Sequence, residues 1–194
     1  MKRKIILSIL VIFAIFIITG CDTKSDNASD NGSSKEIKTN SNSVVLYFSA
    51  TGTTKKVAER VAYQSNSDII EIIPKEKYKS EDLNYNSECR ANREQNDSKS
   101  RPEIKNSIDI TKYDTIYLGY PIWWGTYPKI VLTLLDKYDF TGKTIIPFCT
   151  SGSTGVDDSV EELRKYNSKL IIKDGKRFSS NDSDEAIKKF ITNN

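Results

Sequence analysis

The feature that most constrains the fold is the stretch from Val44 to Thr54, where a short apolar run leads directly into a small, hydroxyl-rich turn. Residues 44–48 are apolar throughout, a length too short for an independent helix but suited to a strand covered on both faces. Residues 49–54 contain hydroxyl side chains and one glycine, and a helical spacing of apolar residues follows. A strand, turn and helix in this order aim backbone N–H groups and the positive end of a helix dipole at one point. The stretch therefore predicts a phosphate-binding turn.

The rest of the chain alternates strand-like and helix-like patterns. Further strands are predicted at 68–74, 114–120, 144–148 and 169–173. Helical stripes are predicted at 57–62, 130–138, 156–163 and 186–191. This alternation favours an α/β fold, a three-layer doubly wound sandwich around a five-stranded parallel sheet. A length of 194 residues with 37% apolar content suits one such domain with appendages.

The polar connection from residue 75 to residue 113 is longer than an ordinary loop, so part of it is expected to be ordered or functional. A short helix is predicted to begin near Ser80. Arg90, Arg93 and Arg101 could reach a ligand, but a surface role is the favoured interpretation.

The amino-terminal segment predicts export and attachment to a membrane. Residues 1–20 combine a basic start with an apolar run that is shorter than the roughly 20 residues of a comfortable membrane span, which is typical of a signal peptide. The small residues before Cys21 resemble the lipobox of bacterial lipoproteins, which implies cleavage before Cys21 and lipid on its thiol. Residues 21–42 then read as a flexible tether, and residues 43–194 as the folded domain. The predicted location is the extracytoplasmic side of the cell membrane; an uncleaved anchor is the alternative.

Composition excludes several kinds of chemistry. The chain has no histidine, which removes Ser-His-Asp and Cys-His nucleophile pairs and HExxH zinc sites. Cys89 and Cys149 lack metal-binding spacing; whether they pair is open, and two unpaired thiols is the preferred interpretation. Without the three basic residues of the signal peptide, 26 basic residues face 26 acidic ones. This balance gives no reason to expect nucleic acid as a partner, and no metal site is predicted.

Three polar loops follow predicted strands, at 49–54, 121–127 and 150–155. In a doubly wound sheet such loops meet at the carboxyl edge, where ligands bind. The middle loop holds both tryptophans, Trp123 and Trp124, and adjacent residues cannot easily face the same interior. At least one indole is therefore expected to line a cleft. Together the loops suit a mononucleotide with a flat, apolar ring.

Three sequence motifs resemble those of the flavodoxin family: SATGTT at 49–54, GYPIWWGTYP at 119–128 and TSGSTG at 150–155. The resemblance covers about residues 43–194. It implies the strand order 2-1-3-4-5 and FMN bound without a covalent link. The cofactor-binding residues that it implies at the phosphate are Ser49, Ala50, Thr51, Gly52, Thr53 and Thr54. Those that it implies at the flavin ring are Pro121, Ile122, Trp123, Trp124, Gly125, Thr150, Ser151 and Gly152. No catalytic residue is predicted.

Three functions remain open at this stage. The favoured one is electron transfer by bound FMN to redox partner proteins or small-molecule acceptors. The second is an FMN-dependent NAD(P)H:quinone-type oxidoreductase, although no nicotinamide site is legible. The third is a binding module without redox chemistry, in which the two tryptophans would anchor a partner.

Overall fold

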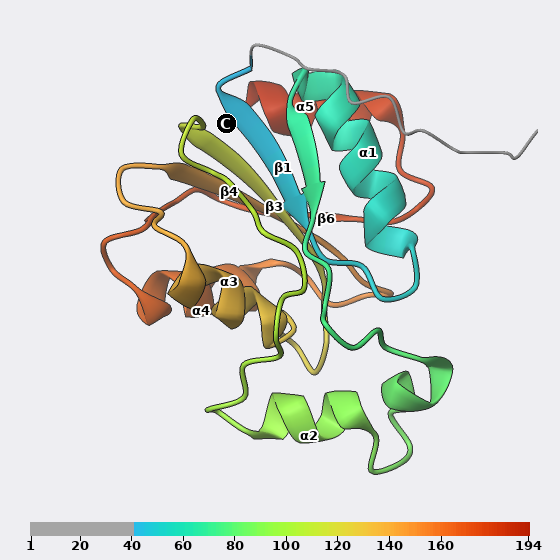
Figure 1. Ribbon diagram of the computed structural model, residues 1–194. Coiled ribbons are helices and arrows are strands. Elements are labelled where there is room, and N and C mark those ends of the chain that lie inside the picture. Colours follow the sequence, from blue (N-terminus) through green and yellow to red (C-terminus); the bar gives the residue numbers. More distant parts are fainter. Residues whose placement is uncertain (1–40) are drawn as a thin grey trace, which may run out of the picture. The chain divides into compact units, whose positions relative to one another are not determined.

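Figure 1 shows the computed structural model of the protein, which describes residues 41–194. The predicted signal peptide, the lipidation site at Cys21 and nearly all of the predicted tether lie outside the described residues. Within the described part, no helix is both long enough and apolar enough to cross a membrane.

The centre of the domain is a parallel sheet with the order β2-β1-β3-β4-β5, as predicted. Its strands are β1 (Ser43–Tyr47), β2 (Asp68–Glu71), β3 (Thr115–Pro121), β4 (Thr144–Thr150), β5 (Ile171–Ile172) and β6 (Lys176–Phe178). The second strand ends three residues before its predicted end, while β4 continues two residues further than predicted. The doubly wound α/β class is confirmed.

The fifth position of the sheet differs in detail from the prediction of one strand over residues 169–173. Two short strands share it: β5 pairs with the start of β4, and β6 pairs with its end. The break lies opposite the middle of β4, where Pro147 has no N–H to donate to a neighbouring strand. The proline therefore produces the local irregularity that its position in the sequence predicted.

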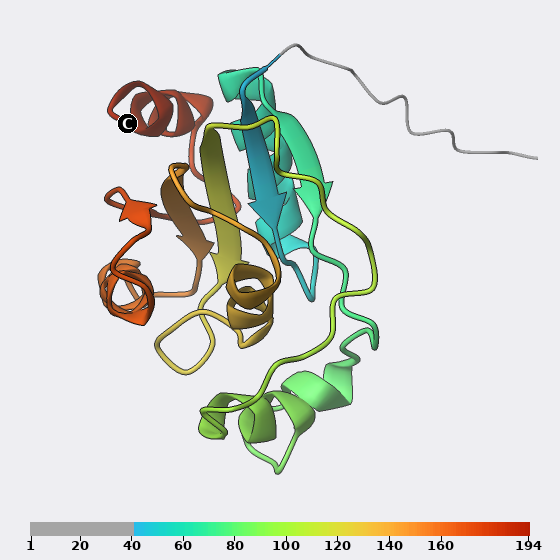
Figure 2. The same ribbon diagram turned by 60° about the vertical axis from the view of Figure 1, so that its left-hand side comes forward.

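Helices cover both faces of the sheet (Figures 1 and 2). Helix α1 (Thr53–Ser65) packs beside α5 (Asp184–Thr192) on one face, and α3 (Ile130–Lys137) and α4 (Asp157–Tyr166) lie on the other. Alternate residues of β1 serve the two faces: Val45 belongs to the core under α1 and α5, whereas Leu46 belongs to the core under α3 and α4. The sheet is thus buried on both sides, which explains its uninterrupted apolar strands.

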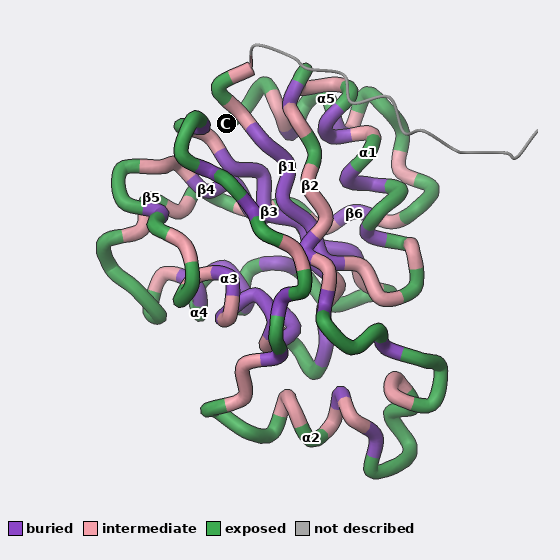
Figure 3. The backbone as a smooth tube through the Cα atoms, in the orientation of Figure 1, coloured by how far each residue is buried: buried purple, intermediate pink, exposed green. Residues whose placement is uncertain are grey.

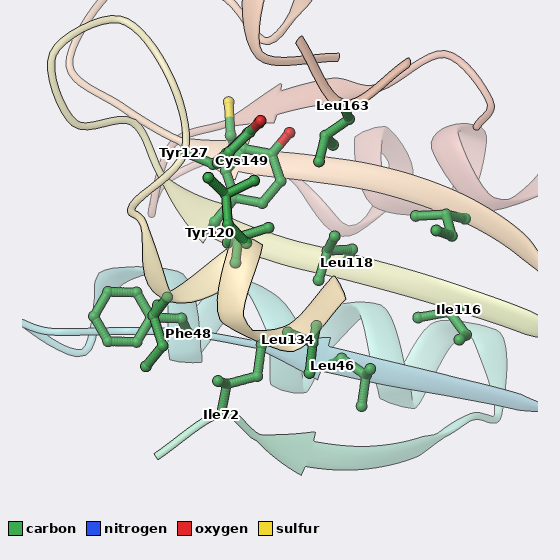
Figure 4. Packing of buried hydrophobic residues seen from close by; sticks show 14 of the residues in the cluster. Leu46, Phe48, Ile72, Ile116, Leu118, Tyr120, Tyr127, Leu134, Cys149 and Leu163 are labelled. Carbon is green, nitrogen blue, oxygen red and sulfur yellow. The ribbon is translucent and has the colours of Figure 1, made fainter. Parts of the chain in front are cut away.

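The core under α3 and α4 is the larger of the two. Figure 3 shows buried residues running along the central strands, and Figure 4 shows Leu46, Leu118 and Leu134 packed together between sheet and helix. All three side chains are fully buried. Burial of one such side chain contributes about 1.5–3 kcal/mol, so the central strands are the most firmly held part of the scaffold.

Part of the 75–113 segment forms helices, in agreement with the prediction that part of it would be ordered or functional; the second of these helices was not predicted. It contains a 3₁₀ helix, Ser80–Leu83, and α2 (Arg90–Asn96), and α2 lies beyond the carboxyl ends of the strands in Figure 1. The segment then returns antiparallel to the chain after β2, with an N–H to O distance of 2.8 Å from Lys75 to Glu103.

The three arginines of this region point to different partners. Arg90 bonds Glu94 at 2.7 Å, Arg93 donates to the Glu88 carbonyl at 2.7 Å, and Arg101 bonds Asp136 at 2.6 Å. Arg93 is exposed, in agreement with the favoured interpretation of a surface role, whereas the Arg90 side chain is half-buried over the Tyr78 ring.

Candidate functional site

Two hydrogen bonds tie together the three loops at the carboxyl edge. The hydroxyls of Thr54 and Thr150 lie 2.8 Å apart and are both buried, which joins the phosphate turn (residues 49–54) to the third loop (residues 150–155). The Ile122 N–H donates to the Thr150 carbonyl at 2.9 Å, which joins the third loop to the tryptophan loop (residues 121–127). The structure thus brings the three predicted loops to one place.

The phosphate turn leaves the start of α1 open to a ligand. Gly52, the N-cap of α1, has φ 88°, a left-handed conformation that glycine adopts without the cost that a Cβ would bring. Its N–H donates to the Ser49 hydroxyl at 3.1 Å. No side chain caps the helix, and its first turn has no acidic residue. The first N–H groups of α1 therefore keep their donor capacity for an anion.

The threonines of this turn have two different roles. Thr51 and Thr53 are exposed, and their hydroxyls lie 3.4 Å apart. Thr54 is 1% exposed and its hydroxyl already bonds Thr150. Ser49 and Ala50 are half-buried, and Ala50 packs against the core. The exposed pair lies at the surface beside the start of α1, whereas Thr54 holds the loops together.

The tryptophan loop is a hairpin with a two-residue tip. Trp123 and Thr126 exchange backbone hydrogen bonds of 2.8 and 3.1 Å. Both tip residues have positive φ, 50° at Trp124 and 87° at Gly125, as a type I′ turn requires. Positive φ is rare for a bulky residue such as tryptophan, and strain of this kind is concentrated at ligand sites.

The turn sends the two indoles to different environments. Trp123 is 5% exposed and packs edge-on against Phe48 and Tyr78, with ring centroids 5.6 and 5.0 Å away. Trp124 is 37% exposed. The expectation that adjacent indoles do not face the same interior agrees with this geometry, whereas the expectation that one of them lines a cleft stays a prediction for Trp124. Pro121 and Ile122 are half-buried behind it, and Gly125 is exposed.

Besides Tyr78, two further residues of the 75–113 segment reach the tryptophan loop, and sequence reasoning identified none of the three. The Gln95 side chain donates to the carbonyls of Trp123 and Tyr127 at 3.1 and 3.2 Å and accepts from the Lys129 N–H at 3.1 Å. Tyr85 stacks on Trp124. Neither residue stands out in the sequence, because their contacts depend on how the long segment folds back over the sheet edge.

The third loop also has a partner that sequence reasoning missed. Arg177 of β6 donates to the carbonyls of Ser151 and Gly152 at 3.3 and 3.5 Å. Ser151 is half-buried and donates from its hydroxyl to the Thr154 carbonyl, while Gly152 is exposed. A guanidinium therefore holds this loop and places a positive charge beside it.

The three loops carry neutral side chains at physiological pH. Tyr127 is their only ionisable residue, and burial raises its pKa further. Cys149, just before the third loop, is buried and unpaired, and burial raises its thiol pKa to about 12. Cys89 is likewise buried and unpaired, and the described residues contain no cluster able to hold a metal ion. Within the three loops, no side chain is therefore suited to acid–base chemistry near neutral pH.

Comparison with known proteins gives a consistent result. The family model described as Flavodoxin matches residues 42–194. A candidate flavoprotein from Bacteroides uniformis is 38% identical, covering 78% of this chain and 98% of its own, with a TM-score of 0.76. A candidate flavoprotein from Bacteroides eggerthii is 37% identical, covering 77% and 95%, with a TM-score of 0.75. A Lactobacillus acidophilus flavoprotein in complex with FMN is 27% identical, covering 70% and 91%, with a TM-score of 0.53. No similar sequence was found among curated proteins.

Proposed function

The chain belongs to the flavodoxin family, so its cofactor is FMN, and from this premise we propose that it is an electron carrier tethered by lipid on Cys21 to the outer face of the cytoplasmic membrane. One observation carries the proposal for the site: an uncapped helix start and an exposed indole lie on loops that are joined through Thr150. The lipobox-like sequence before Cys21 supports the tether.

The donors of the phosphate turn fit the phosphate of FMN. The free N–H groups at the start of α1 and the hydroxyls of Thr51 and Thr53 would donate to its oxygens, and the helix dipole favours its charge. No acidic side chain of the turn opposes an anion. Ser49 and Gly52 would shape the turn through their mutual hydrogen bond.

The exposed indole of Trp124 fits the flavin ring. Offset stacking of two aromatic systems contributes about 0.5–1.5 kcal/mol beyond the burial of their surface. Ser151 and Gly152 would approach the ring from the third loop, where Arg177 holds their carbonyls. Trp123 supports the turn from the core and presents little surface to a ligand.

FMN supplies the electron chemistry, and the protein binds the cofactor, orients it and sets its electrostatic environment. With no titratable pair in the three loops, the chain's own residues are suited to holding the ring rather than to proton transfer with a substrate. This favours exchange of electrons with a redox partner protein or a small-molecule acceptor over catalysis on a bound substrate.

The test begins with the absorption spectrum of the full chain loaded with FMN, followed by a reductive titration and a turnover assay. A carrier should bind FMN, and the reductive titration should then proceed in two separate one-electron steps. It should show no steady-state turnover when NADH or NADPH and a quinone are supplied. Sustained turnover under these conditions would instead identify an oxidoreductase. Absence of a flavin spectrum after reconstitution would contradict both functions and favour a binding module.

A further inference from the structure

Tyr85 covers the exposed indole that the proposed flavin site requires. Its ring stacks on Trp124 with the centroids 4.4 Å apart and the planes tilted by 36°. Tyr85 itself is 57% exposed, so this contact takes place at the surface. The residue comes from the 75–113 segment, far from the tryptophan loop in sequence.

The stretch around Tyr85 is held mainly by local contacts. The described hydrogen bonds of residues 84–88 all run to residues between 84 and 93, such as those from the N–H groups of Asn86 and Ser87 to Asn84. Gln95, in the same segment, makes three bonds to the tryptophan loop and its neighbour Lys129. Tyr78, which packs against Phe48 and Trp123, holds the segment before this stretch, and Gln95 holds it after. Between them lies a locally hydrogen-bonded, exposed stretch that carries Tyr85, the arrangement expected of a part that opens at low cost.

The distance between the two rings leaves no room for a third. Stacked aromatic layers need roughly 3.5 Å each, so a ring placed between Tyr85 and Trp124 would require about 7 Å between their centroids. We propose that Tyr85 is a gate: it occupies the face of Trp124 that the flavin ring takes, and it swings away when FMN binds. This proposal depends on the proposed FMN site, and it identifies Tyr85 as a residue that controls access to that site.

Removal of the gate should make FMN binding faster and tighter. The Tyr85→Ala variant no longer has to break an aromatic contact of about 0.5–1.5 kcal/mol before the flavin stacks, which corresponds to a two- to tenfold lower Kd. Tyr85→Phe keeps the ring and should behave as the unchanged protein. Tyr63→Ala is the matched control, because Tyr63 is 84% exposed on α1 and has no described ring contact.

The experiment uses the flavin-stripped full chain and follows tryptophan fluorescence as FMN is mixed in. Trp123 and Trp124 are the only two tryptophans, so the signal reports on this loop alone. Acrylamide quenching of tryptophan fluorescence in the flavin-free protein provides a second readout. Tyr85→Ala should expose Trp124 and so increase the quenching, whereas Tyr63→Ala should leave the quenching unchanged.

The outcomes separate the gate from the proposed function. Faster and tighter binding with stronger acrylamide quenching supports the gate. Unchanged binding would overturn it, and weaker binding would show instead that Tyr85 is a wall of the filled site. Failure of the unchanged protein to bind FMN would overturn the proposed function, and the gate with it.

Discussion

At the residue scale, the phosphate turn has hydroxyls that hold the fold and others that remain at the surface, where the proposed ligand would bind. Thr54 and Thr150 satisfy each other in the interior, so a buried polar pair joins two site loops without an unsatisfied group. Thr51 and Thr53 remain at the surface beside the uncapped start of α1. The ligand-facing role of the turn should therefore be separable from its structural role by mutation.

Thr51→Glu should weaken FMN binding by at least about tenfold, equivalent to about 1.4 kcal/mol. A carboxylate there places a negative charge against the phosphate, and two like charges 4 Å apart near a protein surface repel by roughly 4 kcal/mol. Isothermal titration of flavin-stripped protein with FMN measures the change. Thr141→Glu is the control, because Thr141 is exposed just before β4, at the opposite edge of the sheet. Equal affinities in the two variants would show that the phosphate is not bound at this turn.

The sequence predicted that the two tryptophans would not both face the interior, but not which one would be exposed. That choice depends on positive φ at Trp124, a conformation that no preference of tryptophan predicts. It also depends on Gln95, whose bonds to the Trp123 and Tyr127 carbonyls fix the loop from a distant segment. Residues whose role is set by a neighbouring chain segment leave no local pattern to find.

At the scale of the strands, the close contact between β3 and β4 depends on one missing side chain. Gly119 of β3 lies against Phe148 of β4, and a Cβ at Gly119 would come within 2.4 Å of the Phe148 ring. The ring is fully buried in the core under α1 and α5. Because the packing is this tight, any group added here would displace β3, the strand that leads into the tryptophan loop.

Gly119→Ala should lower the free energy of unfolding by about 1–3 kcal/mol, because the added methyl group overpacks a filled core. Urea denaturation of flavin-stripped protein measures this without the stabilisation that a bound ligand adds. Gly152→Ala is the matched control: a Cβ at Gly152 meets no atom within 4 Å, so its effect should stay within about 0.5 kcal/mol. A Gly119→Ala variant as stable as the control would mean that the Phe148 ring can shift freely.

The main strands were predictable because they are continuous apolar runs, and the helices α1, α3, α4 and α5 because each has an apolar stripe, whereas α2 was not predicted. The sheet order agrees with the one that the family resemblance implied. The division of the fifth sheet position between β5 and β6 was not predictable, because strands of two and three residues are too short to show a sequence pattern. The course of the 75–113 segment was also out of reach. The sequence shows a long polar connection, but the contacts of Tyr85 and Gln95 depend on how that connection folds against the edge of the sheet.

At the scale of the whole molecule, the sheet separates the proposed point of attachment from the candidate site. β1 begins at Ser43 on the amino edge of the sheet and ends at the phosphate turn on the carboxyl edge. A chain entering at Ser43 from a membrane anchor would thus arrive at the edge opposite the flavin. If residues 21–42 form the proposed tether, a flexible chain of about twenty residues would have a root-mean-square reach of about 25 Å, enough to let the domain turn its proposed site toward partners in the aqueous phase.

The anchor itself gives the last prediction. Intact-mass analysis of membrane-extracted protein should find a chain that begins at Cys21 and carries lipid, because the small residues before Cys21 form the expected cleavage site. Cys21→Ser should remove the lipid and leave the longer chain uncleaved. Cys89→Ser is the control: serine is a good N-cap for α2, so this variant should be processed normally. Unlipidated protein that retains Met1 in the unchanged chain would show that the apolar run is an uncleaved anchor.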